Sequence, residues 1–401
     1  MKKIILPILI ASFGAISAQN VQDQKINFSY IQLPSTPIEG TENYYIEIDN
    51  SLYAAANEDS LSMYEAKLDM AELQMTAWQE QKKTIDKMHL LEMAKWEKAT
   101  NGGVVALTPV KQPYPEMPKM KSEIPAPILT EDIELSTVDA RIALEGFSKS
   151  SNGAKITIKF LGLQNAKITE TKSGSLATTK YEYKATYKMP AIITIENEGQ
   201  GIIYNQTLGN SLVTVTAGDK ASYASKYEYE YWELEKLDQF WIDAQTKAIN
   251  SLLASINNSI NQECGFPKKQ YATEIYTVKS FKSFDYGDLI EGYTKAKQGF
   301  DLVRDPEDMS DSKSKLDEAI QIWMAALEES TPSIKKSRIN DKVTALIYVN
   351  IAEAYLWMNE FDEADTYIQK AKAGGVGKYK REAQNMEAFM KIKKLRYQAS
   401  N

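Results

Sequence analysis

Hydrophobic side chains recur along the chain with two different periods, and each period predicts a different element. Near the N-terminus, apolar and polar positions alternate at 26–31 and again at 44–48. A period of two is typical of β-strands with one buried face. Pro34, Pro37 and Gly40 stand between the two runs and favour a loop. We therefore expect two strands within residues 19–50, the first strands of a β-domain.

The next fifty residues change to a helical period. Apolar side chains recur every three or four positions, and neither glycine nor proline occurs from 51 to 100. This pattern predicts one long amphipathic, coiled-coil-like helix of roughly 45 residues, about 65–70 Å in length. Gly102 and Gly103 favour its end. The apolar positions are Leu61, Tyr64, Leu68, Ala71, Met75, Trp78, Ile85, Met88, Leu91 and Trp96.

A proline-rich segment follows this helix. Six prolines lie between residues 109 and 127, and such a chain is extended at about 3.1 Å per residue, so roughly 30 residues can return along the helix. The apolar side chains expected to pack in this return segment are Val104, Val105, Leu107, Val110 and Ile128. Residues 51–136 then form a stalk inserted into a β-domain; a disordered linker after an ordinary helix is the alternative. We expect the stalk to offer partner-binding residues, namely Met75, Trp78, Met88 and Trp96.

The alternating period resumes after residue 137 and continues to about 220. The runs at 141–147 and 156–160 flank a Ser-Ser-Asn-Gly turn, which predicts a hairpin. Short strands at this spacing are typical of an antiparallel β-sandwich-like or open barrel domain, here 137–220. Further strands are predicted at 166–172, 177–188, 191–196, 202–207 and 211–216.

Three tyrosines share one face of the strand predicted at 177–188. Tyr181, Tyr183 and Tyr187 have the same parity. Exposed, they would form a stacking platform for sugar rings; buried, they are core residues whose hydroxyl groups reach the rim, which is the more common arrangement.

Residues 221–282 predict a long helix followed by a strand at 273–281 that returns to the β-domain. The helix ends before Gly265 and Pro267. Cys264 stands at this end, and we expect it to be a small buried residue, because no second histidine accompanies His89 to pair with it.

The C-terminal part, 283–401, carries a helical repeat pattern. The fuller copy of the pattern lies at 348–371. A partial copy precedes it, with a first helix at 287–303 and second-helix positions at Ala319, Trp323, Ala326 and Pro332. Residues 378–398 are expected to form a capping helix. The pattern resembles the 34-residue tetratricopeptide repeat (TPR), in which alanines let paired helices approach closely. The matching positions are Tyr348, Ile351, Ala352, Tyr355, Ala364, Ile368 and Ala371, with an inter-helix turn at 359–363.

The TPR resemblance implies binding of a peptide or protein in a helical groove, and no catalysis. In proteins with this pattern, the inner face of the first helix is supplied by positions that are here Leu346, Val349, Glu353, Leu356 and Trp357. Trp357 is expected to anchor a partner, because large aromatic residues dominate binding in desolvated pockets. The competing account buries Trp357 against the helix at 378–398.

The first 18 residues predict the compartment. A short basic region precedes an apolar run from Ile4 to Ile16, and Ala18 offers a small residue before Gln19. This pattern is typical of a cleaved signal peptide, and without a nearby cysteine the protein is not a lipoprotein. The Ser-Ala-Gln junction resembles those of exported proteins of Bacteroidota, which implies a periplasmic location. Beyond residue 18, no apolar run reaches the length of a transmembrane helix.

Composition excludes several kinds of partner and site. The chain has 47 basic and 54 acidic residues, so it does not favour nucleic acid. One cysteine and one histidine exclude internal disulfides and zinc sites built mainly from these residues. No catalytic motif is present, so we expect no catalytic residues, cofactor or metal. Glycosidase carboxylates leave no fixed signature, which keeps a carbohydrate-active protein as the alternative.

Together, these patterns predict an α+β protein. An antiparallel β-sandwich-like domain is interrupted by a long helical stalk and followed by a C-terminal TPR-like array. The predicted function is a non-enzymatic periplasmic adaptor or scaffold subunit, which binds protein partners of an outer-membrane assembly, secretion or uptake complex. The alternative is an exported carbohydrate-binding or carbohydrate-active protein that uses the tyrosine-rich face.

Overall fold

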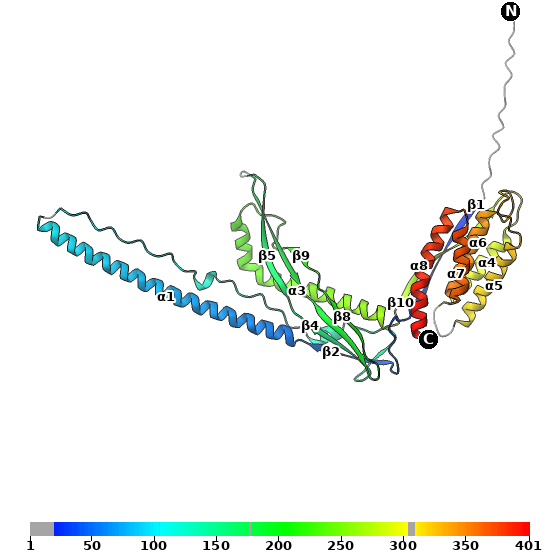
Figure 1. Cartoon of the computed structure of the whole chain (residues 1–401), viewed down its shortest axis with the longest axis horizontal. Helices are drawn as coiled ribbons and strands as arrows, with labels where there is room; N and C mark the ends of the chain where they lie inside the picture. The colour runs from blue at the N-terminus through cyan, green and yellow to red at the C-terminus, as the bar shows by residue number, and fades with distance from the viewer. Residues whose placement is uncertain (1–19, 104, 176–177, 304–308) are drawn as a thin grey trace, which may run out of the picture. The chain divides into compact units, whose positions relative to one another are not determined.

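The structure is a computed structural model that describes residues 20–103, 105–175, 178–303 and 309–401. The predicted signal peptide and the predicted new terminus at Gln19 lie outside these residues. The fold is mixed α and β, with largely antiparallel sheets and a C-terminal helical region (Figure 1). It divides into two compact units. We call them the helical unit, which includes Ser259–Asn401, and the sheet unit, which comprises Asn43–Ala143 and Lys149–Asn258.

In the part of the chain that the structure describes, the helical unit packs five helices and a two-stranded ribbon around one core. Strand β1 (Asn20–Ile31) pairs antiparallel with β10 (Lys268–Ser280). Apolar faces of the helices and of the ribbon supply the core, and the Asn340 side chain caps the first turn of the central helix α6. The helices are α4 (Gly287–Asp301), α5 (Ser310–Leu327), α6 (Asp341–Trp357), α7 (Phe361–Ala373) and α8 (Gly377–Ser400).

The pairing of β1 with β10 differs from the expectation that both strands join the β-domain. The strands themselves are confirmed, but they pair with each other and bury Ile26, Phe28, Ile275 and Val278 in the core of the helical unit. Alternation along a strand reveals that one face is buried. It does not reveal which core covers that face.

The sheet unit contains two sheets. The five-stranded sheet has the order β3-β2-β4-β7-β8, and the three-stranded sheet has the order β5-β6-β9. Side chains of β4 and β7 alternate between buried and half-buried. The bounds are β2 (Asn43–Asp49), β3 (Ser148–Lys149), β4 (Ala154–Phe160), β5 (Gln164–Ser173), β6 (Lys180–Lys188), β7 (Ala191–Asn197), β8 (Gly201–Leu208) and β9 (Val213–Thr216), with helices α2 (Leu135–Asp139) and α3 (Lys226–Glu263).

The strand predicted at 141–147, and therefore the hairpin with 156–160, is wrong. Residues 141–147 are turns and coil in which Ile142 and Leu144 are nonetheless buried. Strand β2 instead pairs parallel with β4. Parallel neighbours need a long crossover connection, and the residues between β2 and β4, the stalk among them, provide it.

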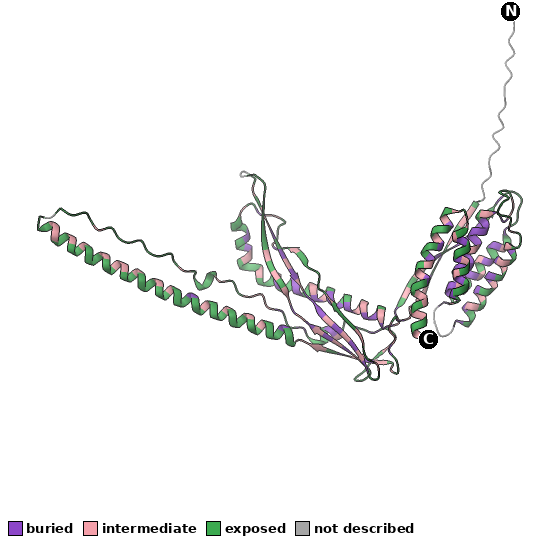
Figure 2. Cartoon of the chain, in the orientation of Figure 1, coloured by how far each residue is buried: buried purple, intermediate pink, exposed green. Residues whose placement is uncertain are grey.

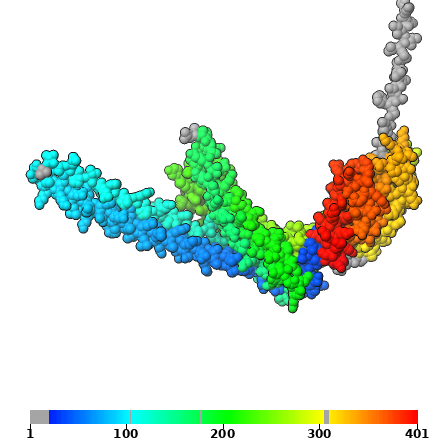
Figure 3. Space-filling model, in the orientation of Figure 1, coloured from blue at the N-terminus to red at the C-terminus, as the bar shows by residue number. Residues whose placement is uncertain are grey.

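The predicted long helix is confirmed as α1 (Ser51–Asn101). Figure 3 shows the chain after α1 lying along this helix. This return segment contains a short 3₁₀ turn, η1 (Lys121–Glu123). We call α1 together with the described residues of 105–134 the stalk. Among the described residues, no helix is both long enough and apolar enough to cross a membrane.

Candidate functional site

The predicted groove on α6 is buried. Leu346, Val349, Glu353, Leu356 and Trp357 are each at most 3% exposed. The prediction that they form an open partner-binding groove is wrong, because the β1–β10 ribbon and α8 cover this face. The Trp357 ring lies 4.8–4.9 Å from the rings of Phe28, Tyr30 and Tyr271 and 5.9 Å from that of Phe389.

Two buried polar side chains explain why the ribbon occupies α6. The Asn350 amide donates to the carbonyl oxygen of Tyr276 at 2.8 Å and accepts from its backbone N–H at 2.9 Å. One turn away, the Trp357 indole donates to Glu353 at 2.9 Å. Burial raises the pKa of Glu353 to about 7, although hydrogen bonds from Trp357 and Thr273 oppose this rise. The inner face of α6 therefore binds a strand of its own chain.

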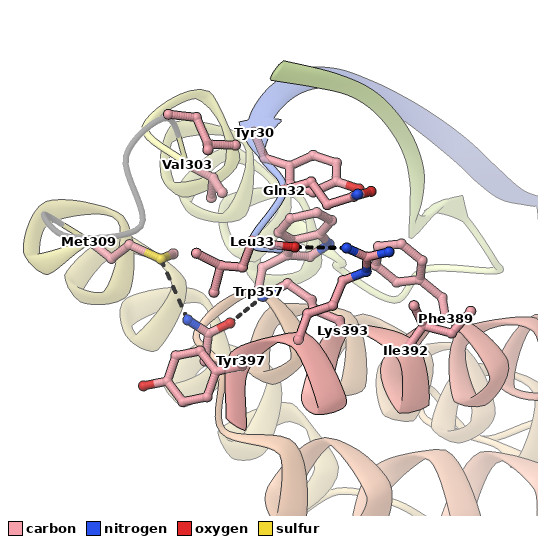
Figure 4. A pocket seen from close by; sticks show the side chains of 13 residues that line it. Tyr30, Gln32, Leu33, Val303, Met309, Trp357, Phe389, Ile392, Lys393 and Tyr397 are labelled. Carbon is pink, nitrogen blue, oxygen red and sulfur yellow. Dashed lines mark hydrogen bonds between the residues drawn. The ribbon is translucent and has the colours of Figure 1, made fainter. Parts of the chain in front are cut away.

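A small cavity adjoins Trp357 between the end of β1 and α8 (Figure 4). Its volume of about 60 Å³ holds a few water molecules rather than a substrate-sized ligand. The Lys393 ammonium hydrogen-bonds to Asn359 and lies 5.1 Å from the Trp357 ring. Burial lowers the pKa of Lys393 to about 8. Arg396 donates to the carbonyl oxygens of Leu33 and Gln262, so the two cations serve the packing of α8.

The described residues contain neither a cluster of metal-ligating side chains nor an exposed thiol. Within 20–103, 105–175, 178–303 and 309–401, no group of three or more His, Cys, Asp or Glu side chains could hold a metal ion. Cys264 is buried, as predicted, and burial raises the pKa of its thiol to about 12. A thiol that stays protonated at neutral pH is a poor nucleophile.

The tyrosine face of β6 is part of a core. Tyr183 stacks on Tyr229 of α3 with ring centroids 3.4 Å apart, and Tyr187 is buried beside Trp241 of the same helix. Tyr181 is half-buried. Because α3 covers the two inner rings, they do not offer an open platform for a sugar.

The base of the stalk is held by amide side chains. Asn57 of α1 donates to the carbonyl oxygen of Thr130 at 2.9 Å and accepts from its N–H at 3.0 Å. Gln245 of α3 does the same for the backbone of Leu129 and Glu131, at 2.9 Å each. Each amide satisfies one backbone donor and one backbone acceptor of residues 129–131, which belong to no sheet. Asn57 thereby joins α1 to the end of the return segment, and Gln245 joins that end to α3.

Two tryptophans hold the return segment along α1. The indoles of Trp78 and Trp96 donate to the carbonyl oxygens of Pro115 and Ala106, both at 2.9 Å, and the Lys121 ammonium pairs with Glu72 at 2.5 Å. The predicted partner residues Trp78 and Trp96 therefore make contacts within the stalk, and Met75 is half-buried on the same side of α1.

Most of the apolar side chains that were expected to pack in the return segment do not do so. Val105, Leu107 and Val110 are almost fully exposed, so the prediction is wrong for these three. Ile128 is half-buried against the core around Tyr183 and α3, and Val104 lies outside the described residues. A proline-rich chain has many free carbonyl oxygens, and indole N–H groups are suited to bind them.

A second apolar stripe on α1 is uncovered. Its five large side chains are between 52% and 72% exposed, and Figure 2 shows α1 exposed along most of its length. At about 100° per residue, the stripe lies roughly 130° around the helix from the covered side. We call it the outer stripe: Met63, Met70, Leu73, Met88 and Leu91.

Sequence reasoning included only Met88 of the outer stripe among the candidate partner residues. Positions 63, 70, 77, 84 and 91 are seven residues apart and are occupied by Met, Met, Ala, Thr and Leu. This second period could have been found, but the covered face, which carries the tyrosines and tryptophans, dominates the pattern.

Comparison with known protein families, with curated proteins and with solved structures finds no match to this chain.

Proposed function

We propose that the protein is a non-enzymatic, exported adaptor whose stalk binds other proteins through the outer stripe. The observation that carries this proposal is the set of exposed methionines and leucines on one face of a helix whose base is fixed by Asn57 and Gln245. Apolar surface of this extent is typical of protein–protein interfaces, and methionine is favoured in adaptable ones. The partners are envelope proteins of an outer-membrane assembly, secretion or uptake complex, and the compartment is the periplasm.

The finer fold expectations belong to the same proposal. Helices α6 and α7 act as one TPR-like pair, α4 and α5 as a degenerate pair, and α8 as the cap. The support is the burial of the small positions Ala352, Ala364 and Ala371 where these helices pack. The two sheets act as the sandwich-like platform from which the stalk extends. The carbohydrate alternative is not favoured, because Tyr183 and Tyr187 are buried.

The test compares two double variants of the tagged full-length protein in its native host. Leu73→Lys with Leu91→Lys places charges on the outer stripe, whereas Leu61→Lys with Leu90→Lys changes exposed leucines elsewhere on α1. Both variants add the same charge and keep good helix formers. We expect the stripe variant to recover its co-purifying envelope proteins at least about tenfold less than the wild type, as for interface anchors, and the control to retain them. Equal recovery by both variants would contradict the proposal.

A further inference from the structure

Charge is distributed unevenly along α1. Residues 51–80 contain six acidic side chains and one lysine, whereas residues 81–101 contain five lysines and three acidic side chains. The half of α1 that begins at the sheet unit is therefore acidic, and the half at the tip is basic.

Part of the outer stripe is symmetric about one small residue, whereas Met70 and Leu73 would meet Thr84 and Gln81. Met63 and Leu91 each lie fourteen positions from Ala77, and Ala66 and Met88 each lie eleven positions from it. Ala77 and Ala66 are themselves exposed. Two copies of α1 that cross at Ala77 in opposite directions would place Met63 beside Leu91 and fit Met88 against Ala66 at both ends of the contact.

We propose that the outer stripe binds a second copy of this chain, with the two α1 helices antiparallel and the two-fold axis at Ala77. This inference rests on the proposed function and names one partner of the same surface. The antiparallel arrangement sets the acidic half of each helix against the basic half of the other, whereas a parallel arrangement would set like charges together. The paired stretch from 63 to 91 is about 42 Å long, and an isologous contact of this kind closes after two copies.

One ion pair is specified by this geometry. Asp59 and Lys95 both lie eighteen positions from Ala77 and fall on the same side of α1 as the outer stripe. Both side chains are exposed. In the antiparallel pair, Asp59 of each copy faces Lys95 of the other.

Cysteine crosslinking of the purified full chain tests the orientation. In a Cys264→Ala background, Ala77→Cys is expected to form a disulfide-linked dimer under mild oxidation, since residues at the two-fold axis approach within disulfide range. Met63→Cys alone and Leu91→Cys alone are expected to form no disulfide-linked dimer, whereas a mixture of the two is expected to crosslink. The matched control, Leu61→Cys, lies off the stripe and should not crosslink. Crosslinking of Met63→Cys with itself would overturn the antiparallel arrangement.

A charge exchange tests the ion pair. By light scattering, the wild type is expected at twice the monomer mass, and Asp59→Lys alone or Lys95→Asp alone to shift the equilibrium several-fold toward monomer. In an equimolar mixture of the two variants, the antiparallel heterodimer pairs a lysine with an aspartate at both 59–95 contacts, so the mixture should recover the dimer; the crosslinking pattern decides the orientation. No recovery, or a wild type that stays monomeric at high concentration and fails to crosslink at Ala77→Cys, overturns the inference. Such a result leaves the adaptor proposal standing if the stripe variant still loses its partners in the host.

Discussion

Glu353 is a carboxyl group enclosed in the core of the helical unit, where burial raises its pKa from the usual 4.5 to about 7. The folded protein thus binds this proton more tightly than the unfolded chain. The resulting stabilisation is fully present below about pH 4.5 and is lost as the pH rises through 7. At neutral pH, the ionised group therefore weakens the fold.

We predict that Glu353→Gln removes this pH dependence. The Gln amide oxygen still accepts from Trp357, but the side chain carries no ionisable proton. The free energy of unfolding of the wild type should fall by up to about 3 kcal/mol between pH 4.5 and 8 relative to that of the variant. Urea unfolding across this range measures the difference. Exposed Glu363→Gln is the control, and parallel curves for wild type and Glu353→Gln would contradict the prediction.

At the same scale, the repeat pattern predicted burial better than it predicted binding. Ala364, Ile368 and Ala371 are buried, as close helix packing requires. Trp357 was expected in an open groove, and the competing account, burial against α8, describes its position. The spacing of apolar residues on α6 identifies which faces are covered. That spacing contains no information about which element covers a face. One face of α6 is covered by a strand some 75 positions upstream, which Asn350 holds.

At the scale of elements, α1 shows how side chains of a helix can provide hydrogen-bond partners for an extended chain. Among the hydrogen bonds of the described residues, the one that the Pro115 carbonyl oxygen accepts comes from the Trp78 indole. Proline has no backbone N–H to donate, so side chains make the hydrogen bonds between the two segments; Tyr114 and Lys121 of the return segment also donate to Asp86 and Glu72 of α1.

We predict that Trp78→Phe loosens the return segment without unfolding α1. The ring keeps its packing, whereas the lost hydrogen bond contributes about 1 kcal/mol, which corresponds to about a fivefold larger open population. Limited trypsin cleavage after Lys111 and Lys119 should therefore be about fivefold faster. Exposed Tyr227→Phe on α3 should cleave at the wild-type rate. Unchanged cleavage in Trp78→Phe would show that other contacts hold the segment.

Element types followed from periodicity, but strand partners did not. Strands β4 to β9 and helices α1, α4 and α8 lie close to their predicted positions. The run at 141–147 alternates as a strand does, yet it is coil whose buried Ile142 and Leu144 supply that alternation. Likewise, β2 gives no local signal that its neighbour β4 is parallel and lies about a hundred residues away.

For the whole molecule, both units are assembled from discontinuous parts of the chain. The helical unit includes Leu144–Ser148 between two parts of the sheet unit. Local patterns describe a continuous stretch, so they divided the chain at 137, 221 and 283. The separate core of each unit, one around α6 and one around Tyr183 and α3, is a property of contacts between distant segments.

The stalk can be shortened without touching either core. In α1, only Tyr53 and Ala71 are buried, and both precede Glu72, which pairs with Lys121 across the two limbs. We predict that joining Glu72 to Lys121 by a short Gly/Ser turn, in place of residues 73–120, leaves a folded protein, because Asn57 and Gln245 still hold the base. Circular dichroism should show a melting temperature within a few degrees of the wild type, while self-association and partner recovery are lost together. A control that replaces only 102–115 removes the tip connection and keeps the outer stripe, so it should retain both. Global unfolding of the shortened protein would show instead that the distal stalk stabilises the sheet unit, and retained binding would place the interface elsewhere.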